Sequence, residues 1–371
     1  MPFFSRELGW GGSRRARAGL VCLASLGLGG CVDAFDPQSE LSQLRVLAVR
    51  PSPASGSPGA EVRLDMLLQD GTVPPGLVDE GREVEVVWFG GCHNPPSRQY
   101  YTCLPYLRQI AQYLDPIVVN TPTEGVPPGY FGVGREFQFS LPDDIVSGAP
   151  RVSTDPVHYG VSYIFFAVCA GHVRPRPDLT DRIPLDCVDR NTGKPLGSRD
   201  FVLGFTTLFS YEGVQNRNPT LLGAEFGRTG LPLAATPGDV QAPCTNDEDC
   251  AAFTNAAGEP FACSETQLCS PTARPCLKGD CPNYRLWPQV DPSSAETVPG
   301  GTHEIVWANF YATSGEVNSN TQLVVDRNAG LLDGYSASWK PPETSGTVRF
   351  FITLNDQRGG ADWTSFDVVV R

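Results

Sequence analysis

Short segments in which apolar residues recur at every second position, separated by Pro- and Gly-rich turns, run along most of the chain after residue 43. Val84, Val86 and Trp88 illustrate this period, which places one face of a strand in a core. Segments of this kind predict strands at 44–50, 61–69, 83–89, 136–141, 158–169, 201–211, 219–226, 284–290, 304–311, 322–325, 335–339, 348–354 and 363–370. The pattern predicts a mainly β protein.

One segment, residues 104–114, has helical periodicity instead. Leu104, Leu107, Ile110 and Leu114 fall on one face of the predicted helix. We expect this helix to plug a β-sandwich rather than to bind a partner.

The order of strands repeats in the two halves of the chain. A strand with a central Trp occurs in each half, at Trp88 and at Trp307, and a later apolar strand begins at Val161 and at Val348. Trp88 and Val161 are 73 residues apart, Trp307 and Val348 only 41, a difference of 32. The next interval is also longer in the first half, by 26 residues, and each excess contains two cysteines. The simplest interpretation is two copies of one sandwich, the first with two insertions at 92–131 and 169–195.

The strand with a central Trp and the closing 354–363 segment, Leu-Asn-Asp-Gln-Arg-Gly-Gly-Ala-Asp-Trp, resemble immunoglobulin-like domains in tandem, as found in bacterial surface lipoproteins. The resemblance implies immunoglobulin-like β-sandwiches at 44–215 and 216–371, although the inter-sheet disulfide of antibody domains is absent. A generic β-sandwich with another strand order is the alternative. Local disulfides, Cys92 with Cys103 and Cys169 with Cys187, are favoured within the insertions.

The N-terminus has the pattern of a lipoprotein signal peptide. A basic segment precedes the uncharged, largely apolar residues 18–30, which are too short to span a bilayer. Leu28-Gly-Gly-Cys31 resembles a bacterial lipobox, which implies a signal peptide at 1–30, acyl chains on Cys31 and a tether at 31–43. The alternative is an ordinary secretory signal with Cys31 as an odd disulfide partner. Without Cys22 and Cys31, ten of the 12 cysteines remain, an even number that suits an oxidised protein.

Six cysteines within 38 residues form a cysteine-rich module at 244–281, inside the second sandwich. They are Cys244, Cys250, Cys263, Cys269, Cys276 and Cys281, spaced C-x5-C-x12-C-x5-C-x6-C-x4-C. No CxxC pair occurs, so three disulfides are favoured over structural zinc, with fifteen possible pairings. The acidic residues 246–249 are interpreted as a solvated turn rather than a calcium site, because the EF-hand pattern is missing. Since the module follows the first strand of the second sandwich, we expect it to lie at the end far from the first sandwich.

Composition narrows the function further. The 41 acidic against 28 basic residues argue against sequence-independent nucleic-acid binding. A mixed metal site at Cys92-His93 and Cys169-x2-His172 is disfavoured, because these pairs would lie at opposite ends of a sheet. No catalytic motif follows a suitable strand. The scattered carboxylates are interpreted as a solvated acidic surface. The sequence therefore indicates neither a cofactor, a metal nor an enzymatic activity.

These features predict a lipid-anchored cell-envelope protein, in the outer membrane of a Gram-negative bacterium, that attaches to the membrane only through its lipid. One hypothesis is surface adhesion or recognition of a protein or glycan ligand by the module and the two insertions. Exposure of Tyr100, Tyr101 and Tyr106 would favour this function, because aromatic residues anchor interfaces. The alternative is a periplasm-facing structural or accessory lipoprotein of an envelope complex.

Overall fold

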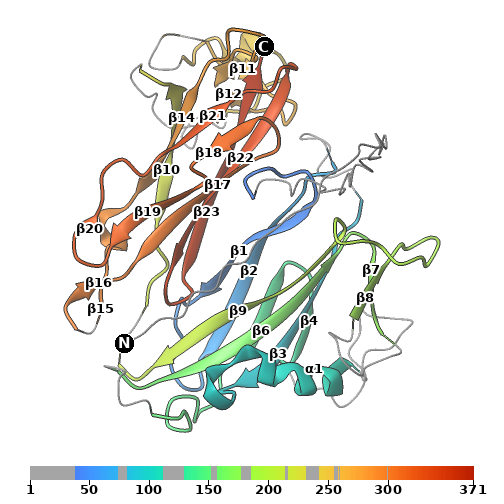
Figure 1. Cartoon of the computed structure of the whole chain (residues 1–371), viewed down its shortest axis with the longest axis vertical. Coiled ribbons are helices and arrows are strands. Elements are labelled where there is room, and N and C mark those ends of the chain that lie inside the picture. Colours follow the sequence, from blue (N-terminus) through green and yellow to red (C-terminus); the bar gives the residue numbers. More distant parts are fainter. Residues whose placement is uncertain are drawn as a thin grey trace, which may run out of the picture. The chain divides into compact units, whose positions relative to one another are not determined.

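A computed structural model describes residues 38–73, 82–111, 129–151, 157–176, 185–213, 216–230, 242–254, 258, 260–298 and 300–371. The predicted signal peptide, Cys31 and most of the tether lie outside these residues. Strands dominate the described part, which confirms the mainly β class (Figure 1). No described helix is long and apolar enough to cross a bilayer.

The first sandwich has two sheets. One has the order β1 (Leu44–Ser52), β2 (Glu61–Asp70), β5 (Glu136–Ser140); the other has the order β4 (Phe131–Val133), β3 (Glu85–His93), β6 (Tyr159–Cys169), β9 (Phe201–Tyr211). This is the immunoglobulin arrangement, with strands A, B and E opposite C′, C, F and G. Trp88 is fully buried between the sheets and stacks on Phe137.

The second sandwich repeats this arrangement. One sheet has the order β10 (Leu221–Arg228), β14 (Tyr284–Val290), β21 (Ala337–Lys340), β18 (Glu316–Asn318). The other has the order β13 (Thr272–Ala273), β23 (Ala361–Val370), β22 (Gly346–Asp356), β17 (Val306–Ala312), β19 (Thr321–Asp326), β20 (Gly330–Leu331). A small hairpin, β15 (Thr297–Val298) and β16 (Thr302–His303), follows the 3₁₀ turn η5 (Pro292–Ser294).

The strands of the two predicted tryptophans are equivalent, but the side chains differ in position. Trp307 lies on the expected strand, and the core-facing residues of β17 are Val306, Ala308 and Phe310, so the Trp307 side chain is half-buried on the other face. The buried tryptophan of the second sandwich is Trp339 on β21, which donates its indole N–H to the Ser314 carbonyl at 3.0 Å.

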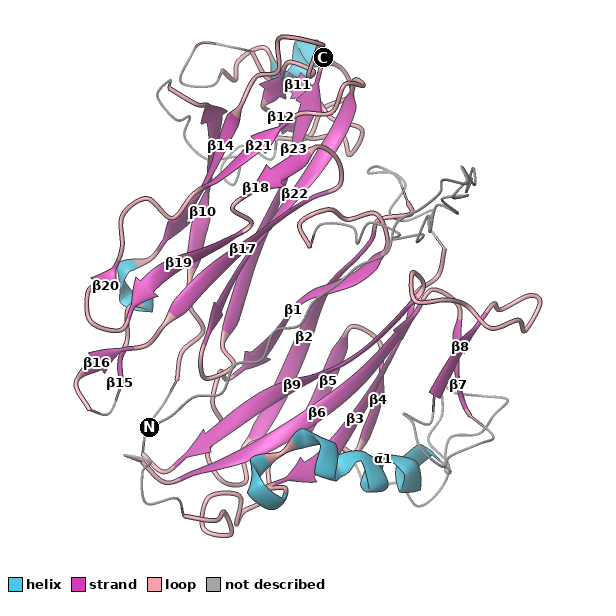
Figure 2. Cartoon of the chain, in the orientation of Figure 1, coloured by secondary structure: helices cyan, strands magenta, loops and turns pink. Residues whose placement is uncertain are grey.

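The predicted helix is also placed differently. It is α1 (Leu104–Ala111), preceded by the 3₁₀ turns η1 (Pro96–Arg98) and η2 (Tyr100–Cys103). Leu107 and Ile110 pack on the outer face of β3 and β6, in a cluster separate from the core between the sheets. The helix therefore forms a third layer and does not plug the sandwich (Figure 2). Leu114 lies outside the described residues.

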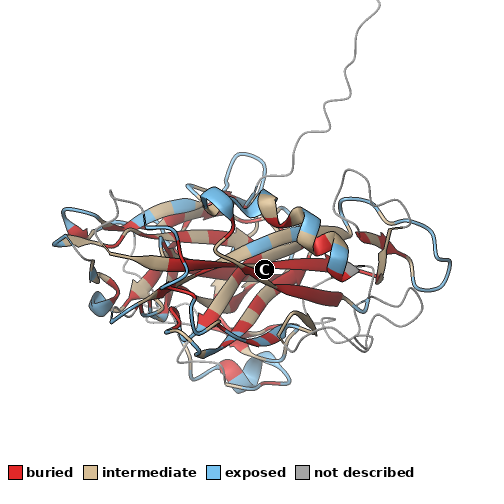
Figure 3. Ribbon diagram, turned by 90° about the horizontal axis from the view of Figure 1, so that it is seen from below, coloured by how far each residue is buried: buried red, intermediate tan, exposed pale blue. Residues whose placement is uncertain are grey.

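Burial explains why the strands under this layer lack a polar face. Val86 and Trp88 of β3 point into the sandwich, whereas Val87 and Phe89 point toward the helix. A strand covered on both faces has apolar residues at consecutive positions. In Figure 3, the buried residues accordingly concentrate in the strands, with exposed residues in the surrounding loops.

A polar network joins the two sandwiches. The buried Asn216 of the linker donates its backbone N–H to Ser55 and its side-chain amide to Asp356, at 2.8 and 3.1 Å. Arg50 of β1 pairs with Asp362 of β23 at 2.9 Å. Hydrogen bonds thus connect the linker to both sandwiches.

Candidate functional site

Two disulfides fix the insertions of the first sandwich. Cys92, near the end of β3, is bonded to Cys103, which ends η2 and precedes α1. Cys169, the last residue of β6, is bonded to Cys187 in the hairpin of β7 (His172–Pro175) and β8 (Leu185–Val188). Both pairings are those favoured from the sequence. The bonds attach each insertion directly to a central strand.

The insertions enclose an apolar pocket with the outer face of the β4–β3–β6–β9 sheet. Its volume is about 240 Å³. The lining residues come from α1, the sheet, the β7–β8 hairpin and the turn before α1: Phe89, Tyr100, Leu104, Leu107, Phe165, Phe166, Leu185, Leu203, Gly204 and Phe205. This volume lies between an engineered cavity that binds benzene, about 150 Å³, and the smallest drug-sized pockets, about 300 Å³. It suits one bicyclic ring or a branched aliphatic group without charge.

Exposed aromatic and aliphatic side chains form the rim of this pocket. Tyr100 stacks on Phe205 with ring centroids 4.4 Å apart, and Tyr163 packs edge-on against Phe205. Tyr100 is 44% exposed, Phe205 39% and Leu203 37%. Adjacent apolar side chains at this exposure are the kind of surface that proteins use to bind ligands.

The three tyrosines singled out in the sequence differ in position. Tyr100 is on the rim, and Tyr101 is 51% exposed next to it. Tyr106 is half-buried and packs against Tyr130, and burial raises the pKa of its hydroxyl. Among the described residues, the buried Tyr106 Oη has no hydrogen-bond partner. Tyr106 therefore supports the layer, while the other two lie at the surface.

The histidines are separate from one another and have structural partners. Cys169 lies opposite Glu85 in the β3–β6 ladder and Cys92 opposite Tyr163, so the two Cys-His pairs lie at opposite ends. His172 Nδ1 donates to the buried Glu85 at 2.8 Å. His93 Nδ1 lies 2.8 Å from Ser162 Oγ, and burial lowers the pKa of His93 to about 4. The other two histidines donate to the Ala149 and Ala295 carbonyls.

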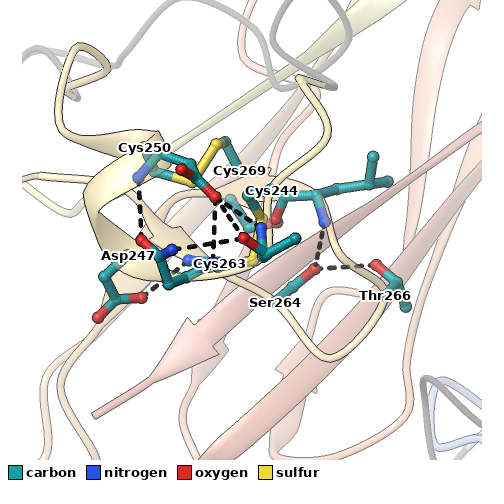
Figure 4. The surroundings of a disulfide bond; sticks show 12 residues. Cys244, Asp247, Cys250, Cys263, Ser264, Thr266 and Cys269 are labelled. Atoms are coloured by element: carbon teal, nitrogen blue, oxygen red, sulfur yellow. Dashed lines mark hydrogen bonds between the residues drawn. A yellow bond between two sulfur atoms is a disulfide. The ribbon is translucent and has the colours of Figure 1, made fainter.

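The cysteine-rich module is ordered by three disulfides and by contacts with the second sandwich. They join Cys244 to Cys263, Cys250 to Cys269, and Cys276 to Cys281. The module contains the 3₁₀ turn η4 (Asp247–Cys250), the hairpin of β11 (Ala262–Cys263) and β12 (Cys269–Ser270), and β13, which pairs in parallel with β23. Three sulfur atoms, of Cys244, Cys250 and Cys269, lie together, but disulfides use all of them (Figure 4).

The acidic turn of the module caps its 3₁₀ helix. Asn246 Oδ1 accepts from the backbone N–H groups of Glu248 and Asp249, and Asp249 accepts from Thr245 N–H. Hydrogen bonds from the Thr245 backbone and hydroxyl hold the pKa of Asp249 below its usual range. Asp247 accepts from Cys263 N–H and pairs with Arg371. Three of these four polar side chains thus stabilise the local backbone.

Not all carboxylates are on the surface, which corrects the sequence interpretation. Glu304 and Asp356 are 2% and 5% exposed beside the loop between β22 and β23. Arg358 pairs with both Glu304 and Glu296, while Asp356 accepts from the Arg358 and Gly360 backbone N–H groups. Burial raises the pKa of Glu304 to about 7 and raises that of Asp356. Hydrophobic periodicity could not predict this cluster, because Glu296, Glu304 and Arg358 come from three separate loops and Asp356 ends β22.

Comparisons with known proteins give distant structural matches only. No protein-family model and no curated protein matches the sequence. The D00-D0 domain of intimin matches 87% of this chain and 99% of its own length, with 10% identity and a TM-score of 0.19. The C-terminal domain of the Streptococcus pyogenes antigen I/II-family protein AspA matches 89% of this chain and 100% of its own, with 10% identity and a TM-score of 0.18. Latent PorU from Porphyromonas gingivalis matches 90% of this chain over 24% of its own, with 11% identity and a TM-score of 0.18.

Proposed function

We propose that this chain is a lipid-anchored cell-surface protein that recognises a ligand through the apolar pocket of its first sandwich. The observation that carries this proposal is the pocket of about 240 Å³ built by two disulfide-bonded insertions. An immunoglobulin-like sandwich needs neither insertion to close its core, as the second sandwich demonstrates. Residues added outside a complete core are free to serve binding.

The lining indicates what the pocket can do chemically. Its side chains are aromatic or aliphatic, and the Tyr100 hydroxyl is the polar side-chain group that they include. Such a surface gains free energy by excluding water from an apolar group, and its lining holds no carboxylate, imidazole, amine or thiol. Binding is therefore the function that this site supports, with an uncharged aromatic or branched aliphatic group as its ligand.

Attachment to the membrane forms the other half of the proposal. The lipobox-like Leu28-Gly-Gly-Cys31 would place acyl chains on Cys31, ahead of the first described strand. Two or more acyl chains provide stable anchoring without a transmembrane helix. The sandwiches would then be held close to the outer membrane, with the pocket available to ligands outside the cell.

Protease shaving of intact cells tests the location. Peptides from residues 244–281 would be followed by mass spectrometry while a periplasmic marker is monitored. We expect their release with the marker intact. Release only after the outer membrane is breached would contradict surface display and leave the periplasm-facing accessory lipoprotein as the function to pursue.

Equilibrium dialysis with indole tests the pocket. We expect a Kd on the order of 1 mM or tighter, equivalent to about 4 kcal/mol. Leu104→Trp should fill the pocket and weaken binding at least tenfold, whereas Leu323→Trp, at an exposed position of the second sandwich, should leave it unchanged. Equal binding by both variants would contradict the assignment of the pocket.

A further inference from the structure

The strand that borders the pocket is the end strand of its sheet. β9 pairs with β6 along its whole length, from Phe201 opposite Cys169 to Tyr211 opposite Tyr159. Its other edge is contacted at both ends and at one point between them. Just before β9 the Arg199 carbonyl accepts from Leu44 N–H of β1, and near its end Gly56 forms an isolated bridge with Ser210. From the second sandwich, a Cβ added to Gly359 (φ +88°) would lie 2.4 Å from the Thr207 carbonyl oxygen. That oxygen thus points away from β6.

The orientation of Thr207 fixes that of its neighbours in the strand. In an antiparallel ladder, residues alternate between those bonded to the partner strand and those whose N–H and C=O both point away. The orientation of Thr207 recurs at every second residue of the strand. The backbone N–H and C=O groups of Phe201, Leu203 and Phe205 therefore also point away from β6, toward the outer edge. Among the described residues, none of these three backbones makes a hydrogen bond outside the β6 ladder.

A groove runs along this open edge. Its volume is about 510 Å³, and its walls include the edge of β1 at Leu44–Leu47, the start of β9, and polar side chains of the second sandwich such as Asn309 and Asn320. Leu203 lines both this groove and the apolar pocket. Two features therefore meet at one place: unpaired backbone groups in a polar groove, and an apolar pocket beside them.

We propose that the ligand is a protein that adds an extended segment to the edge of β9 at Phe201–Phe205 and inserts one large apolar side chain into the pocket. This inference rests on the function proposed above and names its ligand class. An extended backbone can pair with a row of unpaired N–H and C=O groups in a regular register. Side chains of an added strand alternate between faces, so those on the pocket face stand beside Leu203 and Phe205 at the rim.

Amide hydrogen exchange of the free protein tests the open edge. We expect the amides of Phe201, Leu203 and Phe205 to exchange at least about tenfold faster than those of Val202 and Gly204, which the ladder protects. Uniform protection across residues 201–205 would overturn strand addition, because the edge would already be paired.

A synthetic peptide of alternating Thr and Val with one central Trp serves as the binding probe. We expect binding that protects the amides of Phe201, Leu203 and Phe205 from exchange. The same peptide with Trp replaced by Ser, and one N-methylated on the amides of its pairing edge, should each bind at least tenfold more weakly. Equal binding of the N-methylated peptide would overturn the inference, because side-chain insertion alone would then suffice.

Two matched variants of the protein complete the test. Leu203→Lys places a charge at the rim and edge and should abolish peptide binding. Leu222→Lys changes an equally aliphatic, 60% exposed residue on β10, the end strand of the other sandwich, and should leave binding unchanged. If the wild-type protein binds indole but not the peptide, strand addition alone is overturned. If it binds neither, the proposed function of the pocket is overturned as well.

Discussion

The two sandwiches share one strand order but differ in what covers the sheet that contains strands C, F and G. In the first, α1 and the β7–β8 hairpin lie over β3 and β6 and enclose the pocket. In the second, the equivalent outer face includes Phe351 of β22, which packs in a small cluster with Leu47 of β1 and with Leu41, just before the first sandwich. The same framework therefore carries a third layer with a pocket in one copy and a contact between the sandwiches in the other.

This difference separates residues that hold the framework from residues that form the site. Trp88 and Trp339 fill the two cores, whereas Tyr100 and Phe205 lie outside the first core. Substitutions in the cores should thus affect stability in both sandwiches, and substitutions in the layer should affect binding in the first alone.

The largest effects are expected in the cores. Trp88→Ala and Trp339→Ala should each lower the free energy of unfolding by about 3–5 kcal/mol, because each removes a fully buried indole and its hydrogen bond. The half-buried Trp307→Ala should cost about 1 kcal/mol. Urea unfolding measures all three, and an equal loss from Trp307→Ala would contradict its placement outside the core.

Removing the cation of the buried carboxylate cluster should have a similar effect. Arg358→Met leaves Glu296 and Glu304 without their shared partner and should destabilise the protein by about 3–5 kcal/mol. The control in the first sandwich is Arg63→Met, which breaks an exposed pair with Glu136 and should cost less than about 1 kcal/mol. Similar unfolding midpoints for the two variants would contradict the difference in burial.

Disulfide removal should distinguish the third layer from the module. Replacing Cys169 and Cys187 by Ala should lower stability by about 3 kcal/mol and weaken indole binding, because Leu185 of the pocket lies in the released hairpin. Replacing Cys276 and Cys281, which close a shorter loop, should cost about 2 kcal/mol without affecting indole binding. Dialysis and urea unfolding of both variants check this, and undiminished indole binding by the first would contradict the role of the hairpin.

Stability should also depend on pH. Burial, against the opposing hydrogen bond from Arg358, raises the pKa of Glu304 from 4.5 to about 7. The folded state therefore holds this proton more tightly, so its contribution to stability is complete below about pH 4.5 and is lost as the pH rises through 7. Urea unfolding between pH 5 and pH 8 should show this decline, and Glu304→Gln should flatten it; an unchanged slope in the variant would contradict this account.

In the first sandwich, the carboxyl of Asp70 should give a pH dependence of stability with the opposite sign. Although burial disfavours the charged form of Asp70, the hydrogen bonds from Arg82 and Thr72 lower the pKa of its carboxyl. Its contribution is present above the ordinary pKa of 3.8 and is lost as the pH falls further. Asp70→Asn should remove this contribution, which unfolding measurements between pH 2 and pH 5 would detect.

Alternation in the sequence predicted most of the long strands, because one face of each is buried. The exceptions β3 and β6 are covered on both faces and have apolar residues at consecutive positions. Alternation missed β4 and β18, each of three residues, since so short a segment has no measurable period. It correctly paired Trp307 with Trp88 as residues of equivalent strands, but the two side chains lie on different faces. The alternation of Val306, Ala308 and Phe310 identifies the buried face correctly.

The pocket itself was beyond sequence reasoning. Phe89, Leu104, Leu185 and Phe205 are far apart in the chain, and only the sheet pairing and the two disulfides bring them together. The two insertions and their cysteine pairs could be recognised from the sequence, and Tyr100 and Tyr101 as candidates for exposed residues. The sequence could not show which of the fifteen disulfide pairings the module adopts, because the spacing of the cysteines does not decide between them.

The most direct test of the central claim is a nuclear magnetic resonance titration of the methyl-labelled protein with indole. We expect shifts confined to the methyl groups of Leu104, Leu107, Leu185 and Leu203, with those of Val317, Val324 and Leu354 in the second sandwich unchanged. Shifts in the second sandwich, or none in the first at millimolar indole, would contradict the claim that the insertions of the first sandwich form the binding site.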